Sequence, residues 1–401
     1  MVVPIAGRAI AAVAGALLVI TATRSVIGTV IVPRPVGSWL TRWVDKIVNG
    51  AYIVITSVIA HCRRLARREP GERNRVESGV VKLAGNWADR TSIDQIFAGQ
   101  ASVILLGQLV AWVVIFYIGF TLLMWPFIHD GIATAFSLAG PGVFGPNDSF
   151  GAAERTIADL AAIAALITVT LQIAYLPTLY SAYNRRETEV ALLNARAGVP
   201  SRGPELLART HYALGSGAST IDTLPDLYQQ WERWAADIAE SHTTYLPLVR
   251  FRSPRPMSSW VTALLAILDS AALYLALSPE SAPEVPARLC LRSGFLCFRD
   301  VARAMGIDVP DEPDPSAGIS ITYDDFLDAV NRMRRVDFPI ERDRELEEAW
   351  TDFVGWRVNY EQAAYGLAYA LDVVPALWSG PRRHPRAPIA PIRPPEGRPP
   401  K

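Results

Sequence analysis

The sequence predicts an all-α membrane protein in which about three transmembrane helices precede a helical cytosolic domain. Half of the 401 residues are hydrophobic and only 19% are charged, below the roughly 25% of an ordinary soluble domain. The uncharged residues gather in three long runs, and few segments alternate apolar and polar residues with the period of a strand. With 39 basic and 39 acidic side chains the net charge is zero, so no field of the whole chain attracts nucleic acid.

Residues 9–32 form the first run and predict an N-terminal membrane anchor over residues 1–36. About 20 apolar residues are needed to cross roughly 30 Å of hydrocarbon as a helix, and this run is apolar except for Arg24. A cleaved signal peptide is the alternative, because the uninterrupted apolar core is short and Arg8 precedes it. The second apolar stretch, residues 25–32, favours an uncleaved anchor.

Residues 37–100 predict a cytoplasmic amphipathic and basic linker. Apolar residues recur at helical spacing from Trp39 to Ala51, with charged residues between them. The continuation to Ala60 is too short to cross a membrane alone, so a shallow or re-entrant placement competes with a helix packed on the bundle. Residues 33–100 hold eleven Lys and Arg and residues 129–154 hold none. The positive-inside rule therefore places the N-terminus outside and everything after the third run inside.

Residues 101–184 contain the other two runs, 103–128 and 157–180, joined by a glycine-rich segment. A stretch that can form a short helix, residues 131–139, leads into Gly140, Gly142, Val143, Phe144 and Gly145. A ring of carbonyl oxygens around an ion requires backbone handedness that glycine adopts without steric cost. These five residues are candidates for an ion filter on a re-entrant pore loop, and an ordinary outer turn of Gly, Pro, Asn and Asp is the alternative that spacing alone favours.

Outer helix, short helix with a Gly-rich loop, and inner helix follow one another as in the pore module of the tetrameric potassium-channel superfamily. Several motifs over roughly residues 95–280 resemble bacterial proteins classed as potassium-channel-like: Tyr175-Leu176-Pro177-Thr178-Leu179-Tyr180, Asn184-Arg185-Arg186-Glu187, Ala195-Arg196-Ala197-Gly198, Glu240-Ser241-His242, Arg252-Ser253-Pro254 and Ser259-Trp260. The resemblance implies a homotetramer in the bacterial inner membrane that conducts potassium or another monovalent cation.

The filter departs from that family. Potassium channels present Thr-Val-Gly-Tyr-Gly, whereas this chain has Gly142-Val143-Phe144-Gly145 with Pro141 and Pro146 on either side. Phe144 stands where the family has its aromatic residue, but the prolines remove backbone donors that would brace the loop. The filter is therefore degenerate, and a non-conducting membrane scaffold or sensor is the alternative function.

Two further residues are candidates in the third run. Pro177 lies near its cytoplasmic end, where loss of a helical hydrogen bond would allow a gate hinge, and simple termination of the helix at the interface is the alternative. Asp159 lies near the outer mouth, where it would concentrate cations, or else it is a first-turn residue favoured by the helix dipole.

Residues 185–380 predict a helical cytosolic domain and residues 381–401 a disordered Pro- and Arg-rich tail. The tail has eight prolines in 21 residues. Residues 258–277 are almost all apolar and are long enough to be a fourth span, but Asp269 near the middle favours a buried core helix. We expect its partner to be one of three nearby arginines, Arg250, Arg252 or Arg255.

No catalytic residue, cofactor or metal site is predicted. The helix neighbours Ser241 and His242 are expected to point to different faces, and no nucleophile elbow or HExxH motif is present. The three cysteines, Cys62, Cys290 and Cys297, have no zinc spacing, and the last two read as small apolar residues of a helix. The predicted partners are the lipid bilayer, monovalent cations and further copies of the same chain.

Overall fold

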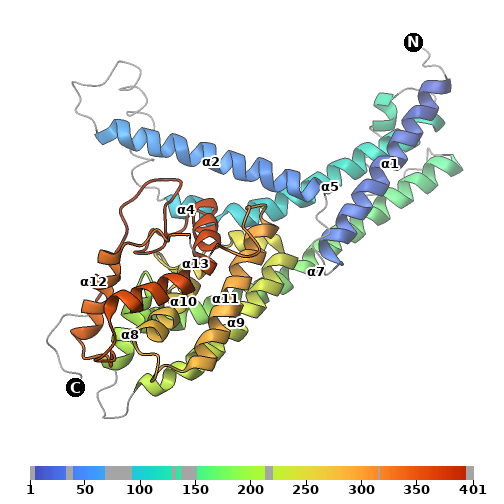
Figure 1. Ribbon diagram of the computed structural model, residues 1–401. Helices are drawn as coiled ribbons and strands as arrows, with labels where there is room; N and C mark the ends of the chain where they lie inside the picture. The colour runs from blue at the N-terminus through green and yellow to red at the C-terminus, as the bar shows by residue number, and fades with distance from the viewer. Residues whose placement is uncertain are drawn as a thin grey trace. The chain divides into compact units, whose positions relative to one another are not determined.

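The computed structural model describes residues 5–32, 39–67, 93–128, 132–136, 151–212, 220–314 and 317–393. Within these ranges the chain is helical, and the only β-type pairing is an isolated bridge between Ala376 and Ile389 (Figure 1). Contacts divide the chain into two compact units, unit 1 (Met1–Ser181) and unit 2 (Ala182–Lys401). An all-α fold is therefore confirmed for the described residues.

Unit 1 is made of long apolar helices. Its elements are α1 (Ile5–Val30), α2 (Trp39–Arg67), α4 (Ile93–Ala98), α5 (Gln100–Met124), η2 (Trp125–Phe127) and the first part of α7 (Ala152–Ala197). The three predicted apolar runs coincide with α1, α5 with η2, and α7. Pro126 lies in η2, where the backbone of α5 tightens before the helix ends.

Helices α1 and α5 pack antiparallel at very short range. A Cβ atom added to Gly15 would lie 2.5 Å from the Gly119 carbonyl oxygen and 2.8 Å from the Leu123 backbone nitrogen. Further along the pair, Trp112 Nε1 donates to Ser25 Oγ over 2.8 Å, and both residues are buried. Small residues that let backbones approach, joined by a polar contact, are typical of helix pairs in lipid.

Helix α2 is continuous from Trp39 to Arg67, so the predicted amphipathic stretch and its continuation form one element. One side packs on α5: the Cβ position of Gly107 lies 3.3 Å from Val44, and Gln100 Nε2 donates to Asn49 Oδ1 over 3.0 Å. Other apolar side chains of this helix, including Ile47, are exposed.

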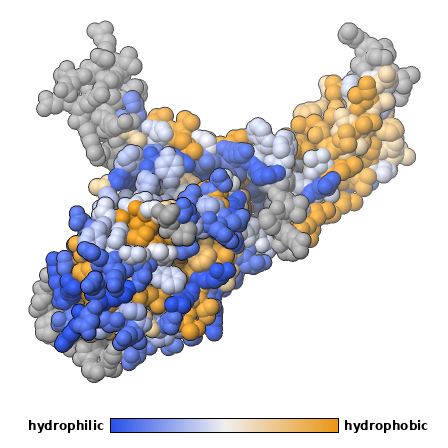
Figure 2. All heavy atoms as spheres, viewed as in Figure 1, coloured by the Kyte–Doolittle hydropathy of each residue, from blue (hydrophilic) through white to orange (hydrophobic). Residues whose placement is uncertain are grey.

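In the described part of the chain, five helices are long and apolar enough to cross a membrane: Ala6–Val30, Trp39–Cys62, Gln100–Phe127, Ala152–Ala197 and Trp260–Leu277. The first four expose many large apolar side chains, among them Leu17, Leu106 and Leu166. Figure 2 shows hydrophobic residues gathered over α1, α5 and the first part of α7. Because water would penalise so large an apolar surface, unit 1 is embedded in a membrane.

Unit 2 is a helical domain around one central helix. Its elements are the end of α7, α8 (Gly203–Tyr212), η3 (Thr220–Thr223), α9 (Leu224–Thr244), η4 (Leu246–Arg250), α10 (Trp260–Leu277), α11 (Glu284–Ala304), α12 (Tyr323–Arg334) and α13 (Leu346–Ala370). Helix α10 contacts α8, α9, α11 and α13, and all of its residues are buried. The prediction of a buried core helix at 258–277 is confirmed.

The ends of these helices follow local signals. Ser259 caps α10 by accepting a hydrogen bond from the backbone N–H of Val261. Thr322 and Asp325 form a reciprocal capping box at the start of α12. Helix α13 ends at Ala370, and Asp372 just beyond this end has a φ of 47°, as is common after the last turn of a helix.

Asp269 in the middle of α10 is paired with Arg357 of α13, and not with Arg250, Arg252 or Arg255 as the sequence led us to expect. Arg357 Nη1 donates to Asp269 Oδ1, and the Tyr360 hydroxyl donates to the same oxygen over 2.9 Å. The true partner is 88 residues away in sequence, on a helix that packs along α10.

Residues 381–393 are packed on unit 2, which corrects the prediction of a disordered tail from residue 381. The buried side chain of Arg382 donates to the carbonyl oxygens of Val373 and Val374 over 2.6 and 2.8 Å. The backbone N–H of Ile392 donates to the Val199 carbonyl oxygen over 3.1 Å. The prolines prevent this segment from forming a helix, but its hydrogen bonds hold it on the domain.

Candidate functional site

The five filter candidates, Gly140, Gly142, Val143, Phe144 and Gly145, lie outside the described residues. Asp159 lies in the second turn of α7 and is exposed. Pro177 lies inside α7. The described parts of the candidate pore module are therefore its two long helices and residues 132–136, which are helical.

Residues 132–136 are held against α5 and α7. The Tyr117 hydroxyl donates to the Phe136 carbonyl oxygen over 2.6 Å, and the two rings meet edge to face with centroids 4.7 Å apart. Ala135 is fully buried in a cluster with Met124 of α5 and Ala158 of α7. A short helix thus fits between the C-terminal end of α5 and the start of α7.

Helix α7 does not end at Pro177, so the interpretation of this residue as a simple helix terminator is wrong. The helix continues to Ala197. A proline inside a helix removes one backbone N–H donor and leaves the carbonyl one turn earlier without its partner. Pro177 is therefore a weak point within a long helix, as a hinge requires.

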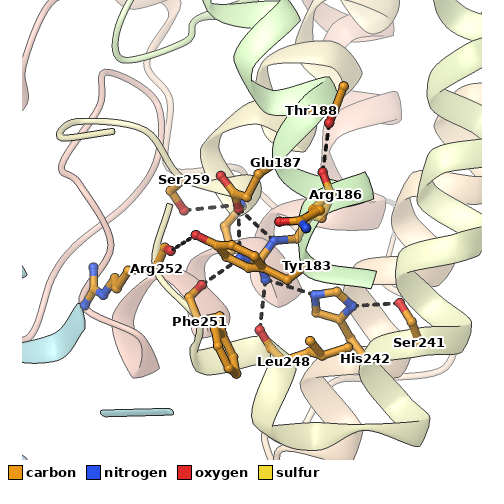
Figure 3. Close-up of polar contacts among 12 residues, drawn as sticks. Tyr183, Arg186, Glu187, Thr188, Ser241, His242, Leu248, Phe251, Arg252 and Ser259 are labelled. Atoms are coloured by element: carbon orange, nitrogen blue, oxygen red, sulfur yellow. Dashed lines mark hydrogen bonds and ion pairs between the residues drawn. The ribbon is translucent and has the colours of Figure 1, made fainter. Parts of the chain in front are cut away.

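The end of α7 carries a buried arginine, Arg186, whose guanidinium is surrounded by polar groups of unit 2 (Figure 3). Its Nε donates to Glu187 Oε1 over 2.9 Å, its Nη1 to the Leu248 carbonyl oxygen over 2.8 Å and its Nη2 to the Phe251 carbonyl oxygen over 2.7 Å. A further contact of 3.0 Å joins Nη1 to His242 Nε2. With the 2.8 Å ion pair from Nη2 to Glu187, every N–H of the guanidinium has an acceptor.

The partners of Arg186 fix the tautomer of His242. A guanidinium can only donate, so His242 Nε2 is the acceptor and the ring proton is on Nδ1. Nδ1 lies 3.0 Å from Ser241 Oγ, which in turn donates to the Asp237 carbonyl oxygen over 2.6 Å. Ser241 and His242 thus do touch, contrary to the expectation from their helix positions, but the serine proton points away from the imidazole.

Burial governs the charges of this cluster. Burial, together with the charge of Arg186, holds the pKa of His242 well below its usual value, so the ring is neutral at physiological pH. Burial also lowers the pKa of Arg186, and the neighbouring Glu187 carboxylate opposes this effect. Since arginine titrates so far above neutral pH, Arg186 remains charged.

Two more side chains extend the cluster to the C-terminal part of unit 2. The Tyr183 hydroxyl donates to the Arg252 carbonyl oxygen over 3.0 Å, and the Arg186 guanidinium lies 5.3 Å from the centre of the Tyr183 ring. The Arg252 guanidinium donates to the carbonyl oxygens of Leu371 and Asp372, which follow α13. The end of α7 is therefore bound through α9, η4 and the loop after it to the end of α13.

A surface pocket of about 280 Å³ lies beside this cluster. The end of α7 supplies Asn184, Glu187 and Asn194, and the loop before α10 supplies Arg255 and Ser258. Asn194 Nδ2 donates to Ser258 Oγ over 2.9 Å. Polar side chains from two segments of unit 2 thus line one space.

The sequence singled out Asn184-Arg185-Arg186-Glu187, Glu240-Ser241-His242 and Arg252-Ser253-Pro254 only as marks of a resemblance, and unit 2 brings these three motifs together. Nothing in a single sequence tells a buried arginine after an apolar run from one that faces the cytoplasm. Among the described residues, no three His, Cys, Asp or Glu side chains form a metal-binding group.

Cys290 and Cys297 are fully buried in α11, and burial raises the pKa of both thiols. They are apolar core residues, as the sequence indicated. Comparisons of the whole chain with protein-family models, with curated proteins and with solved structures found no match, so the geometry of the site carries the functional argument.

Proposed function

We propose that the protein is an ion-channel-like protein of the bacterial inner membrane that conducts potassium or another monovalent cation through a homotetrameric pore. In this proposal the N-terminus is outside, unit 2 is cytosolic, and residues 140–145 line the pore. The observation that carries the proposal is the short helix at residues 132–136, packed between α5 and α7. Such a helix between two spans is the part of a pore module that aims a loop at the pore axis.

Unit 2 would control the inner helix in this proposal. Pro177 interrupts the hydrogen bonds of α7, and Arg186 anchors the end of the same helix in the cytosolic domain. Because every donor of Arg186 is engaged, the end of α7 has little freedom to move apart from η4 and α9. A rearrangement of unit 2 would therefore carry the end of α7 with it. The helix would bend at Pro177, while the contacts of Arg186 with unit 2 are kept.

Cation flux into liposomes tests this proposal. Purified protein is reconstituted, and potassium and sodium uptake are compared between the wild type and a variant with Gly142→Ala and Gly145→Ala. Gly50→Ala is the matched control, since a Cβ atom added to Gly50 meets nothing within 4 Å. We expect flux that is lost in the double variant and unchanged in the control.

The oligomeric state gives a second test. The detergent-solubilised protein should have roughly four times the chain mass of 43.9 kDa, because one chain supplies only one loop to the pore. A monomer in mild detergent that stays monomeric after crosslinking in the membrane would contradict the pore. A tetramer without flux for any cation would favour the second candidate.

That second candidate is a non-conducting membrane scaffold or sensor. The pocket beside the end of α7 favours it, because Arg255 faces the pocket and its guanidinium has no protein partner among the described residues. A sensor would bind a small polar molecule there and pass the effect to α7. If the wild-type protein shows no flux, and a ligand protects α7 from proteolysis, these results would support a sensor over a channel.

A further inference from the structure

The residues around Glu205 form a second charged cluster, separate from Arg186. Glu205 lies in the first turn of α8, and its side chain is only 1% exposed. Arg209 Nε donates to Oε1 over 3.0 Å, Arg332 donates to both oxygens over 3.0 Å, and Arg393 Nε donates to Oε2 over 3.1 Å. Three arginines from α8, α12 and the C-terminal segment therefore share one carboxylate.

The cluster carries more positive charge than its partners neutralise. A fourth arginine, Arg202, lies just before α8 and pairs with the exposed carboxylate of Asp328 at 3.6 Å. Its buried Nε has no hydrogen-bond partner among the described residues. Around Glu205 itself, three guanidiniums face one carboxylate, which leaves a net charge of about plus two.

The arginines also have donors to spare. A guanidinium has five N–H donors, and the bonds from Arg209, Arg332 and Arg393 use only a few of them on Glu205 and on the Ile392 carbonyl oxygen. Their side chains are 17%, 12% and 34% exposed, so part of each one is open to solvent.

The three guanidiniums are close enough to contact one anion. Since the donating nitrogens of Arg209 and Arg332 each lie 3.0 Å from Glu205 Oε1, they are at most about 6 Å apart. The nitrogens of Arg332 and Arg393 that share Oε2 are equally close. Planar guanidinium forks bind phosphate oxygens in pairs, and three such forks lie together here.

We propose that Arg209, Arg332 and Arg393 form a binding site for a phosphate-bearing anion on unit 2, with Glu205 holding the three guanidiniums in place. The ligand is a free phosphate compound or the phosphate headgroup of an anionic lipid. Arg393 belongs to the C-terminal segment, so the bound anion also fastens this segment to α8 and α12. The site is independent of conduction, and its test does not depend on flux.

Titration of inorganic pyrophosphate into the full chain tests the site. The protein is held in phosphatidylcholine nanodiscs, and binding is measured by calorimetry. We expect saturable binding that weakens at least tenfold in Arg393→Gln and in Arg209→Gln. Arg288→Gln is the matched control, because Arg288 pairs with Glu284 on the exposed face of α11 and should leave binding unchanged.

Arg393→Gln is the decisive variant, since this residue is the most exposed of the three and its loss should leave unit 2 folded. Glu205→Gln gives a second readout: a neutral amide holds the three guanidiniums less firmly, so thermal stability should rise less steeply with pyrophosphate than in the wild type. Absence of saturable binding to the wild type, or an equal loss in Arg288→Gln, would overturn the proposal.

Nanodiscs that contain phosphatidylglycerol distinguish the two sources of phosphate. If the lipid headgroup occupies the site, pyrophosphate binding weakens in these discs, and Arg393→Gln abolishes that competition. If pyrophosphate binds equally well in both kinds of disc, the ligand is a soluble phosphate compound.

Discussion

Replacement of Arg357 by methionine should be the most damaging single change in the core of unit 2. The guanidinium is fully buried and donates to Asp269, to Glu361 Oε2 over 2.7 Å and to the Trp378 carbonyl oxygen over 2.6 Å. Burial alone would lower the pKa of Arg357, but the Asp269 carboxylate and neighbouring groups raise it well above its usual value, so the charge is kept.

The magnitude follows from what the variant leaves behind. Arg357→Met strands the carboxylates of Asp269 and Glu361 in the core, and removal of one partner of a buried ion pair costs about 3–5 kcal/mol. Asp269→Asn keeps an acceptor for Arg357 and for the Tyr360 hydroxyl, so we expect a cost of about 1–2 kcal/mol. For a domain of this size, each kcal/mol lowers the melting midpoint by roughly 2–4 °C.

The assay uses the two buried cysteines of α11. In a Cys62→Ala background, the thiols of Cys290 and Cys297 react with a thiol-specific fluorophore only when unit 2 opens, so fluorescence against temperature reports its unfolding. Arg288→Met is the matched control on the exposed face of the same helix; it removes a surface ion pair and a contact with the Trp356 ring, with an expected cost below about 1 kcal/mol.

The order of the variants is the test. We expect Arg357→Met to lower the midpoint by roughly 6–20 °C, and Asp269→Asn by less. An Arg357→Met protein that melts like the Arg288→Met control, or above Asp269→Asn, would refute the reasoning that a stranded carboxylate dominates the energy of this core.

Two further predictions concern pH and helix packing. The folded-state pKa of His242 is lowered, so below about pH 6.5 the unfolded chain binds a proton that the folded chain does not. The free energy of unfolding should therefore decrease as the pH is lowered, by up to about 1.4 kcal/mol per pH unit. His242→Gln should flatten this slope in a melting series from pH 7.5 to 5, His61→Gln should not, and equal slopes in all three proteins would contradict the assignment. Gly15→Ala should destabilise the α1–α5 pair by about 1–3 kcal/mol, because its new methyl group meets the Gly119 backbone. Gly50→Ala should have no such effect on detergent melting curves, and an unchanged Gly15→Ala protein would exclude the close contact.

The sequence predicts most helices because each is encoded locally. The apolar runs of α1, α5 and α7 are long enough to be recognised one at a time. The helices of unit 2 show helical spacing over stretches that match α8 to α12 within a few residues. In the sequence, Asp269 is what favours a buried helix over a membrane span for α10. The structure pairs this carboxylate with the buried guanidinium of Arg357.

The pairings could not be predicted because they depend on how helices pack. Any of several arginines fits a lone Asp269, and only the packing of α13 on α10 selects Arg357. The same holds for Arg186: a basic residue just after an apolar run reads as a cytoplasmic flank, whereas its side chain is buried among α9 and η4. Charge counts describe composition and contain no information on burial.

In the C-terminal segment, a buried arginine supplies hydrogen-bond donors to the backbone, a role that the sequence does not indicate. Proline-rich chain lacks helical hydrogen bonds, and its carbonyl oxygens would be left without donors when buried. Arg382 provides those donors: its guanidinium bonds the carbonyl oxygens of Val373, Val374, Ser379, Gly380 and Pro381. Arg186, Arg252 and Arg357 each do the same for other irregular segments. Arginine side chains thus supply donors to the backbone carbonyl oxygens of these irregular segments.

Arg382→Lys separates this role from charge alone. Burial lowers the pKa of Arg382 to about 10, with the Asp372 carboxylate opposing the shift, and a lysine there would keep a positive charge. Its single ammonium has three donors and no fork, so at least two of the five carbonyl oxygens would lose their donor, at a cost of about 2–4 kcal/mol. The thiol assay should show an earlier opening of unit 2 for Arg382→Lys and no shift for Arg288→Lys. If the two lysine variants melt together, charge and not the guanidinium fork holds the segment after α13.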